Sequence, residues 1–310
     1  MNLRDLDYII AVAEFEHFGK AADSCHISQP TLSTQISKIE AELGVKIFER
    51  NSRSLQITAI GATIIARARA IQSEVREIHN LAAAERDPMG GSLRLGIIPT
   101  LSPYLAPLLL PPLARACPRL SLEWHEDMTH SLVTKFLNFD LDFMLLATLP
   151  ESLDSDEFLI QPLFTEPFYL ALPRTHRLAA ATSLAMSDLM PSELLLLAEG
   201  HCLRDQIVDL CSGPALRQPT ANDFRAASLE TLLALVEHGL GVTLVPALAL
   251  PTNPPYDSQG LVFRPLGRDG GSRQIRLITR HSFGRPKLRW ELAKTIQSHL
   301  PKTVTIVNSL

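Results

Sequence analysis

The chain has 310 residues, of which 46% are hydrophobic and 20% are charged, and its formal net charge is −4. This composition is typical of globular proteins, and the length suits two domains better than one. No secretory leader and no run of eighteen apolar residues is found, so we expect a cytoplasmic protein that does not bind membranes. Because the chain is not basic overall, any contact with nucleic acid must be local.

The first quarter of the chain predicts a helical unit, since apolar residues recur at helical spacing and proline is almost absent. Residues 18–37, FGKAADSCHISQPTLSTQIS, predict two helices around a tight turn, with Ser28 as the N-cap of the second helix. Short polar side chains on exposed turns of a helix can contact base edges in the major groove, as in a helix-turn-helix. The polar residues on the first turns of this helix include Gln29, Thr31 and Ser33.

The segment after this helix predicts a wing. Residues 43–61, LGVKIFERNSRSLQITAIG, predict two short strands around a loop with Arg50 and Arg53, which can contact DNA phosphates. Residues 1–58 nevertheless hold six basic and eight acidic residues. Small helical hairpins are also common in proteins that do not bind DNA. The pattern alone therefore leaves both DNA binding and a purely structural role open.

Residues 59–86 predict one long helix, and the Pro and double Gly of ERDPMGGS, residues 85–92, end it. The apolar stripe along this helix contains Ile64, Ile71, Val75, Ile78 and Ala82. Such a stripe fits either a helix packed on the protein surface or a helix that pairs with its copy in a dimer.

From about residue 92 onwards, short strand-like runs alternate with helical stretches. The alternation predicts an α/β domain with a largely parallel sheet. Thr100 and Thr129 each follow a predicted strand, where the clefts of α/β proteins open. Taken alone, each threonine is better explained as a strand-end or helix-cap residue.

Two cysteines lie close together in residues 198–213, AEGHCLRDQIVDLCSG, which predict a short helix. Nine helical residues separate two Cα atoms by about 13 Å, whereas a disulfide needs Cα atoms within roughly 7 Å. Cys202 and Cys211 are therefore either unrelated buried thiols or partners whose bond unfolds the segment. Cys202 stands at the expected helix start, where a thiolate is stabilised. Whether His201 or Arg204 faces its sulfur is left open.

The remaining cysteines and the histidines predict no further site. We expect Cys25 to be a small buried hydrophobe, and Cys117 to lie at a helix end where it can be exposed. The ten histidines show no metal-binding spacing, and adjacent residues such as His201 and Cys202 rarely bind one zinc ion. We therefore expect no metal and no cofactor.

Several motifs of the N-terminal segment resemble a known family. The runs AA, SQPTLS, I..IE.ELGV.IFER and TAIG are similar to the winged helix-turn-helix of the LysR-type transcriptional regulators. The resemblance implies a winged helix-turn-helix at 1–58, a dimerisation linker helix at 59–88, and a regulatory domain at 89–310 with two lobes like periplasmic binding proteins. It also implies a dimer of dimers on double-stranded DNA. Bases would be approached by Gln29, Thr31 and Ser33, and phosphates by Arg50 and Arg53.

Within that family the chain resembles the OxyR branch, which senses hydrogen peroxide. The runs IPTLSPYL, THSL, GHCLRDQIVDLC and FRAASLETLLALVEHGLGVTLVPALA carry this similarity, which covers essentially the whole chain. In that branch peroxide oxidises a first cysteine to a sulfenic acid, and a second cysteine converts it to a disulfide. Cys202 and Cys211 stand in those places. The resemblance also places Thr100 and Thr129 around the peroxide and Arg273 as an aid to thiol activation.

The resemblance implies a transcription regulator of antioxidant genes, not an enzyme. Its partners would be promoter DNA, RNA polymerase and thiol reductants such as glutaredoxin or thioredoxin. Two alternatives stay open: a metabolite-responsive regulator with incidental cysteines, and a thiol peroxidase. The DNA-binding pattern and the lack of a C-x-x-C motif disfavour the peroxidase.

Overall fold

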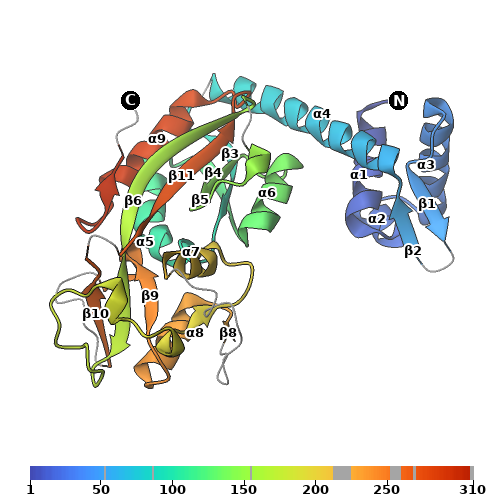
Figure 1. Ribbon diagram of the computed structural model, residues 1–310. Helices are drawn as coiled ribbons and strands as arrows, with labels where there is room; N and C mark the ends of the chain where they lie inside the picture. The colour runs from blue at the N-terminus through green and yellow to red at the C-terminus, as the bar shows by residue number, and fades with distance from the viewer. Residues whose placement is uncertain are drawn as a thin grey trace. The chain divides into compact units, whose positions relative to one another are not determined.

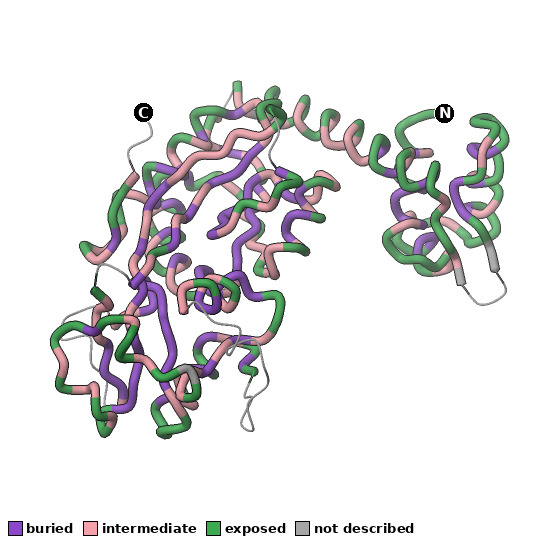
Figure 2. Tube along the Cα trace, in the orientation of Figure 1, coloured by how far each residue is buried: buried purple, intermediate pink, exposed green. Residues whose placement is uncertain are grey.

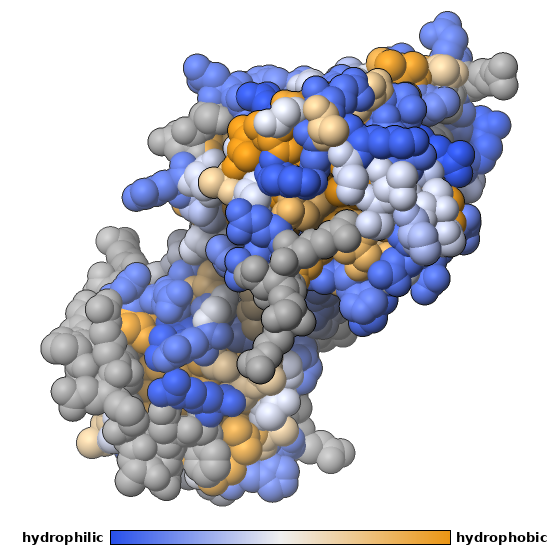
Figure 3. Space-filling model, turned by 90° about the vertical axis from the view of Figure 1, so that its right-hand side faces the viewer, coloured by the Kyte–Doolittle hydropathy of each residue, from blue (hydrophilic) through white to orange (hydrophobic). Residues whose placement is uncertain are grey.

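The computed structural model describes residues 1–51, 54–85, 87–153, 156–211, 225–251, 260–267 and 270–307. The chain forms two compact units, Met1–Ala83 with Leu137–Asp140, and Ala84–Phe136 with Leu141–Leu310. In these described ranges, no helix combines the length and apolar character needed to cross a membrane. Hydrophilic residues cover much of the face shown in Figure 3, with smaller hydrophobic areas among them.

The first unit consists of three helices, a β-hairpin and a long fourth helix (Figure 1). Its elements are α1 (Leu3–Phe15), α2 (Phe18–Ser24), α3 (Gln29–Leu43), β1 (Phe48–Asn51), β2 (Ser54–Ile57) and α4 (Ala59–Ala84). The Ser28 hydroxyl caps α3 by accepting a hydrogen bond from the Thr31 N–H at 3.3 Å. β1 and β2 pair antiparallel. The predicted helix-turn-helix and wing are therefore confirmed.

A buried carboxylate ties the wing to α3. Glu40 lies on α3, and its Oε1 accepts the N–H groups of Ile47 and Phe48 at 2.9 and 3.1 Å. Its Oε2 accepts from Lys46 Nζ at 2.6 Å. These hydrogen bonds hold the pKa of Glu40 below its ordinary value, even though burial alone raises it. The carboxylate thus holds the first residues of the wing against α3.

The apolar stripe of α4 is only partly covered. Ile64 packs against the hydrophobic cluster of the first unit. Ile71 and Ile78, farther along the helix, are 43% and 64% exposed in the single chain. Intrachain packing therefore does not account for these two residues, and pairing of this helix with a second chain stays a prediction.

The second unit alternates strands and helices (Figure 1). Its elements are β3 (Gly91–Ile97), α5 (Ser102–Ala116), β4 (Leu120–Glu126), α6 (Thr129–Leu137), β5 (Phe143–Leu146), β6 (Phe158–Pro173), β7 (Leu196–Leu197), α7 (Cys202–Leu210), β8 (Arg225–Ala226), α8 (Leu229–Glu237), β9 (Thr243–Pro246), β10 (Leu261–Pro265), β11 (Ser272–Arg280), α9 (Pro286–Ser298) and β12 (Thr305–Ile306).

The sheet of this unit is mixed, so the prediction of a largely parallel sheet is wrong. Strands β4 and β5 pair parallel with β3. In contrast, β6 pairs antiparallel with β9, β10, β11 and β12, and β11 pairs antiparallel with β5. The antiparallel character follows from β6, a 16-residue strand that connects two lobes. Its residues 158–167 pair with β11, and residues 168–173 pair with β9 and β10.

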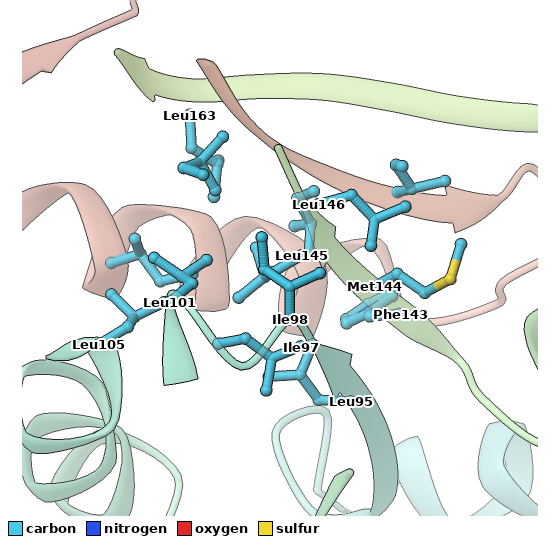
Figure 4. Packing of buried hydrophobic residues seen from close by; sticks show 14 of the residues in the cluster. Leu95, Ile97, Ile98, Leu101, Leu105, Phe143, Met144, Leu145, Leu146 and Leu163 are labelled. Carbon is cyan, nitrogen blue, oxygen red and sulfur yellow. The ribbon is translucent and has the colours of Figure 1, made fainter. Parts of the chain in front are cut away.

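Each lobe has its own hydrophobic core. The first core lies among β3, β5, α5 and α9, and Figure 4 shows part of it, including Ile97, Leu105 and Leu145. The second core contains Leu232 of α8 and Leu244 of β9. Figure 2 shows buried segments in both regions. The predicted two-lobed α/β architecture is confirmed, with β6 as one strand through both lobes.

Candidate functional site

Helix α7 lies where the two cores meet. Its first residue, Cys202, is 8% exposed and belongs to the core of the first lobe. The next residue, Leu203, and Ile207 belong to the core of the second lobe. Gly200 adopts φ +96°, a left-handed conformation that favours glycine, just before the helix begins. A thiol is thereby placed at a helix N-terminus and at the junction of the lobes.

A narrow pocket, with no room for a water molecule in this conformation, lies beside this thiol. It is lined by Ile98, Pro99, Thr100, Met128, Thr129, Gly200, His201 and Cys202. Two of its polar atoms, Thr129 Oγ1 and His201 Nδ1, are buried and have no hydrogen-bond partner among the described residues. Since buried polar atoms are normally paired, these two would bind a small polar ligand once the lining side chains move apart.

His201 is held as a neutral imidazole. Its Nε2 lies 3.1 Å from the carbonyl oxygen of Ala227, which can only accept, so Nε2 carries the hydrogen. Burial lowers the pKa of His201, and the hydrogen bond to Ala227 opposes this effect in part. Nδ1 therefore carries a lone pair and can accept a hydrogen bond from a ligand in the pocket.

The buried imidazole makes stability depend on pH. Between the lowered pKa of folded His201 and the ordinary histidine pKa of 6.5, the unfolded chain binds a proton that the folded chain does not, so the free energy of unfolding falls as the pH decreases through this range. We expect part of this fall to be lost in His201→Asn. Thermal unfolding of both proteins from about pH 5 to about pH 8 tests this, and identical pH profiles would contradict it.

Arg273 and Thr100 form a buried hydrogen-bonded cluster. Arg273 Nη1 donates to Thr100 Oγ1 at 2.8 Å, and Nη2 donates to the Thr100 carbonyl at 2.9 Å. The Nε of Arg273 donates to Glu166 Oε1 at 2.8 Å, and neither the Arg273 nor the Glu166 side chain is exposed. The structure thus brings Thr100, Thr129, His201 and Cys202 together around one pocket and joins Arg273 to it through Thr100.

Cys211 is at the opposite end of α7 from Cys202. It forms the C-cap, its N–H donates to the Ile207 carbonyl at 3.0 Å, and it packs against the core of the second lobe. Burial raises the pKa of Cys211, which keeps the group a protonated thiol at neutral pH. The helix holds the two cysteines apart by roughly 13 Å, and both are free thiols.

Two other sequence interpretations are decided by the structure. Arg204 lies 3.9 Å from Glu199 and 3.6 Å from Asp205, so its guanidinium pairs with carboxylates, while His201 lines the pocket beside Cys202. Cys117 lies at a helix end as expected, but it is 2% exposed and not accessible to solvent. It is buried because α5 packs its last turn into the first core.

Both units match known families. Residues 3–62 match the family described as bacterial regulatory helix-turn-helix protein, lysR family, and residues 86–300 match the LysR substrate binding domain. The chain belongs to the LysR family. LysR-type proteins are DNA-binding transcription regulators without enzymatic activity, so the prediction of a regulator is confirmed.

Relatives of the chain include OxyR proteins and hydrogen peroxide-inducible genes activators. The chain is 43% identical to the hydrogen peroxide-inducible genes activator of Pectobacterium carotovorum, over 97% of each protein. A full-length OxyR variant from Pseudomonas aeruginosa has a TM-score of 0.80 at 35% identity and covers 100% of this chain and 99% of its own. A Corynebacterium glutamicum OxyR variant with bound hydrogen peroxide has a TM-score of 0.62 at 32% identity and covers 96% and 92%. Within the LysR family, the chain belongs to the OxyR branch.

The predicted DNA-contacting residues of this LysR-type protein lie in its first unit. Gln29 and Thr31 are exposed on the first turn of α3, and Ser33 is half-buried. Arg50 lies in strand β1 of the wing, and Arg53 lies outside the described residues. Their contacts with DNA stay predictions.

The sequence interpretation missed Glu166 and Met128. Met128 lines the pocket directly before Thr129, and Glu166 anchors Arg273. A signal for Glu166 was present, since FTEPFYLAL holds one charge within an apolar strand-like run. A charge in such a run is buried only when it is paired.

Proposed function

We propose that this LysR-type regulator senses hydrogen peroxide through a reversible disulfide between Cys202 and Cys211 and controls antioxidant genes. The observation that carries the proposal is a buried thiol at the start of α7, beside a small pocket with two unpartnered polar atoms. Peroxide is a small molecule whose oxygens both donate and accept hydrogen bonds. The bound peroxide in the Corynebacterium OxyR variant supports the choice of ligand.

The chemistry needs only the two thiols and peroxide. The Cys202 thiolate attacks one peroxide oxygen, the O–O bond breaks, and the other oxygen leaves as hydroxide, which takes up the proton released by the thiol. The products are Cys202 sulfenic acid and water. The Cys211 sulfur then displaces the hydroxyl group from the sulfenic sulfur, which gives a disulfide and a second water. A thiol reductant such as glutaredoxin or thioredoxin reverses the reaction.

The second step requires a change of conformation. A disulfide brings the Cα atoms within roughly 7 Å, whereas α7 separates positions 202 and 211 by nine helical residues. At least part of α7 must therefore unwind. Because α7 contributes side chains to both cores, we propose that this unwinding changes the surfaces through which the regulatory domains contact each other.

The rearrangement of α7 would alter DNA binding through the way the chains assemble. We propose that 1–58 binds DNA, that 59–88 pairs two chains through the exposed part of the α4 stripe, and that 89–310 senses peroxide. Gln29, Thr31 and Ser33 would contact bases, and Arg50 and Arg53 would contact phosphates. Two such dimers would bind one promoter in the cytoplasm and recruit RNA polymerase.

A brief pulse of dilute peroxide tests this function. We expect mass spectrometry to find a peptide pair linked through Cys202 and Cys211, and we expect nuclease footprints of reduced and oxidised protein on promoter DNA to differ. A wild-type chain that forms no such disulfide, or an oxidised chain with an unchanged footprint and assembly state, would contradict the proposal.

A further inference from the structure

Glu166 is a fully buried carboxylate whose role the peroxide chemistry above does not explain. It lies on β6 directly opposite Arg273 on β11. Its Oε1 accepts from Arg273 Nε at 2.8 Å, and its Oε2 accepts from the Leu248 N–H at 2.9 Å. Both carboxylate oxygens are therefore occupied. Glu166 fixes the guanidinium at the point where β6 passes from one lobe to the other.

The fixed guanidinium determines which way the Thr100 hydroxyl donates. Thr100 Oγ1 already accepts an N–H from Arg273 Nη1, and a guanidinium cannot accept a hydrogen bond. The single hydrogen of the Thr100 hydroxyl must then point to some other acceptor. Thr100 lines the pocket beside Cys202, so this hydrogen is available to a ligand there.

We propose that Glu166 is a positioning residue of the peroxide site, acting through Arg273 to make Thr100 a hydrogen-bond donor to the leaving oxygen of hydrogen peroxide. The proposal rests on the proposed function. When the Cys202 thiolate attacks one oxygen and the O–O bond breaks, negative charge develops on the other oxygen, which departs as hydroxide and becomes water on taking up the thiol proton. A donor fixed before the reaction stabilises that charge without having to reorient.

The test compares two reactions of the same thiol in Glu166→Gln. Glutamine keeps the size of the side chain but replaces one acceptor oxygen with an NH2 group, which would meet the N–H of either Arg273 or Leu248. In either orientation Arg273 loses the negative charge that anchors it. We expect oxidation of Cys202 by hydrogen peroxide to slow about tenfold or more. Alkylation of Cys202 by iodoacetamide breaks no O–O bond, so its rate should change less than about twofold.

The ratio of the two rates separates positioning from general damage to the fold. Asp142→Asn is a matched control, because Asp142 pairs with Arg94 at 2.6 Å in the same unit but does not line the pocket. We expect its ratio to equal that of the wild type. If Glu166→Gln does not fold, Arg273→Lys tests the same point, since a lysine keeps the positive charge but lacks the planar fork that reaches Glu166 and both Thr100 oxygens at once.

A double-mutant cycle tests the route through Thr100. In a Thr100→Val background, Glu166→Gln should lower the ratio no further, because the hydroxyl that it orients is absent. The positioning role is overturned if Glu166→Gln leaves the ratio of oxidation to alkylation unchanged, or if it lowers the ratio equally with and without the Thr100 hydroxyl. In both cases the proposed function still stands if peroxide oxidises Cys202 of the wild type. A wild-type chain whose Cys202 is not oxidised by peroxide overturns both.

Discussion

Peroxide sensitivity is expected to disappear in the Cys202→Ser variant. A serine hydroxyl is not ionised at neutral pH and is a far weaker nucleophile than a thiolate, so oxidation within α7 should slow at least about a hundredfold. The variant should still bind promoter DNA, since Cys202 lies in the second unit and the helix-turn-helix in the first. Mass spectrometry of α7 peptides and footprints with and without peroxide measure the two properties.

The matched control for this substitution is Cys25→Ala. Cys25 is a half-buried free thiol beside α2 in the first unit, and it should be replaceable without loss of the peroxide response. If Cys202→Ser kept a full response while the wild type formed the disulfide, the disulfide would be incidental. A metabolite-responsive regulator would then be the better interpretation.

Oxidation is also expected to remove the hydrogen-exchange protection of α7. The helix runs without interruption from Cys202 to Leu210, and Cys211 caps it through its N–H. A Cys202 to Cys211 bond is incompatible with that geometry. We expect the amides in the second half of α7 to exchange at least about a hundredfold faster in the disulfide form, as for a segment that has unfolded locally.

Two controls make this measurement specific. Helix α8, Leu229–Glu237, has a Ser228 N-cap and should keep its protection, because no bond forms within it. Cys211→Ser treated with peroxide should also keep α7 protected, since a sulfenic acid on Cys202 requires no approach of the two ends. Full protection of α7 in a protein shown to carry the disulfide would disprove the unwinding.

The helical unit was predictable because its signals are local. Ser28 caps α3 from the adjacent position, and the apolar spacing of α1 and α3 is visible within a few turns. The parallel or antiparallel pairing of the strands in the sheet was not predictable from local signals. β6 carries Pro162 and Pro167, which interrupt its strand pattern, and its partners β9, β10 and β11 come much later in the chain.

The candidate site also combines features that are visible in the local sequence with features that only the folded structure shows. Cys202 and Cys211 lie at the two ends of one short predicted helix, so helical geometry alone predicts their separation, which the structure confirms. Thr100, Thr129 and Arg273 were predicted by family resemblance, since isolated threonines have no distinctive pattern. Glu166 lies 107 residues from Arg273, so only the folded structure shows that they pair. The roles of all these residues stay predictions until the experiments above are done.

The carboxylate of Glu40 limits how a conformational change in the regulatory domains can alter DNA binding. Because it bonds α3 to the first residues of the wing, α3 and the wing of one chain should move together as one rigid DNA-binding unit. A signal from the regulatory domains then has little scope to reshape the surface that meets one half-site. Such a signal can alter the distance and angle between the DNA-binding units of different chains. We therefore expect the regulator to distinguish promoters by the spacing of their half-sites.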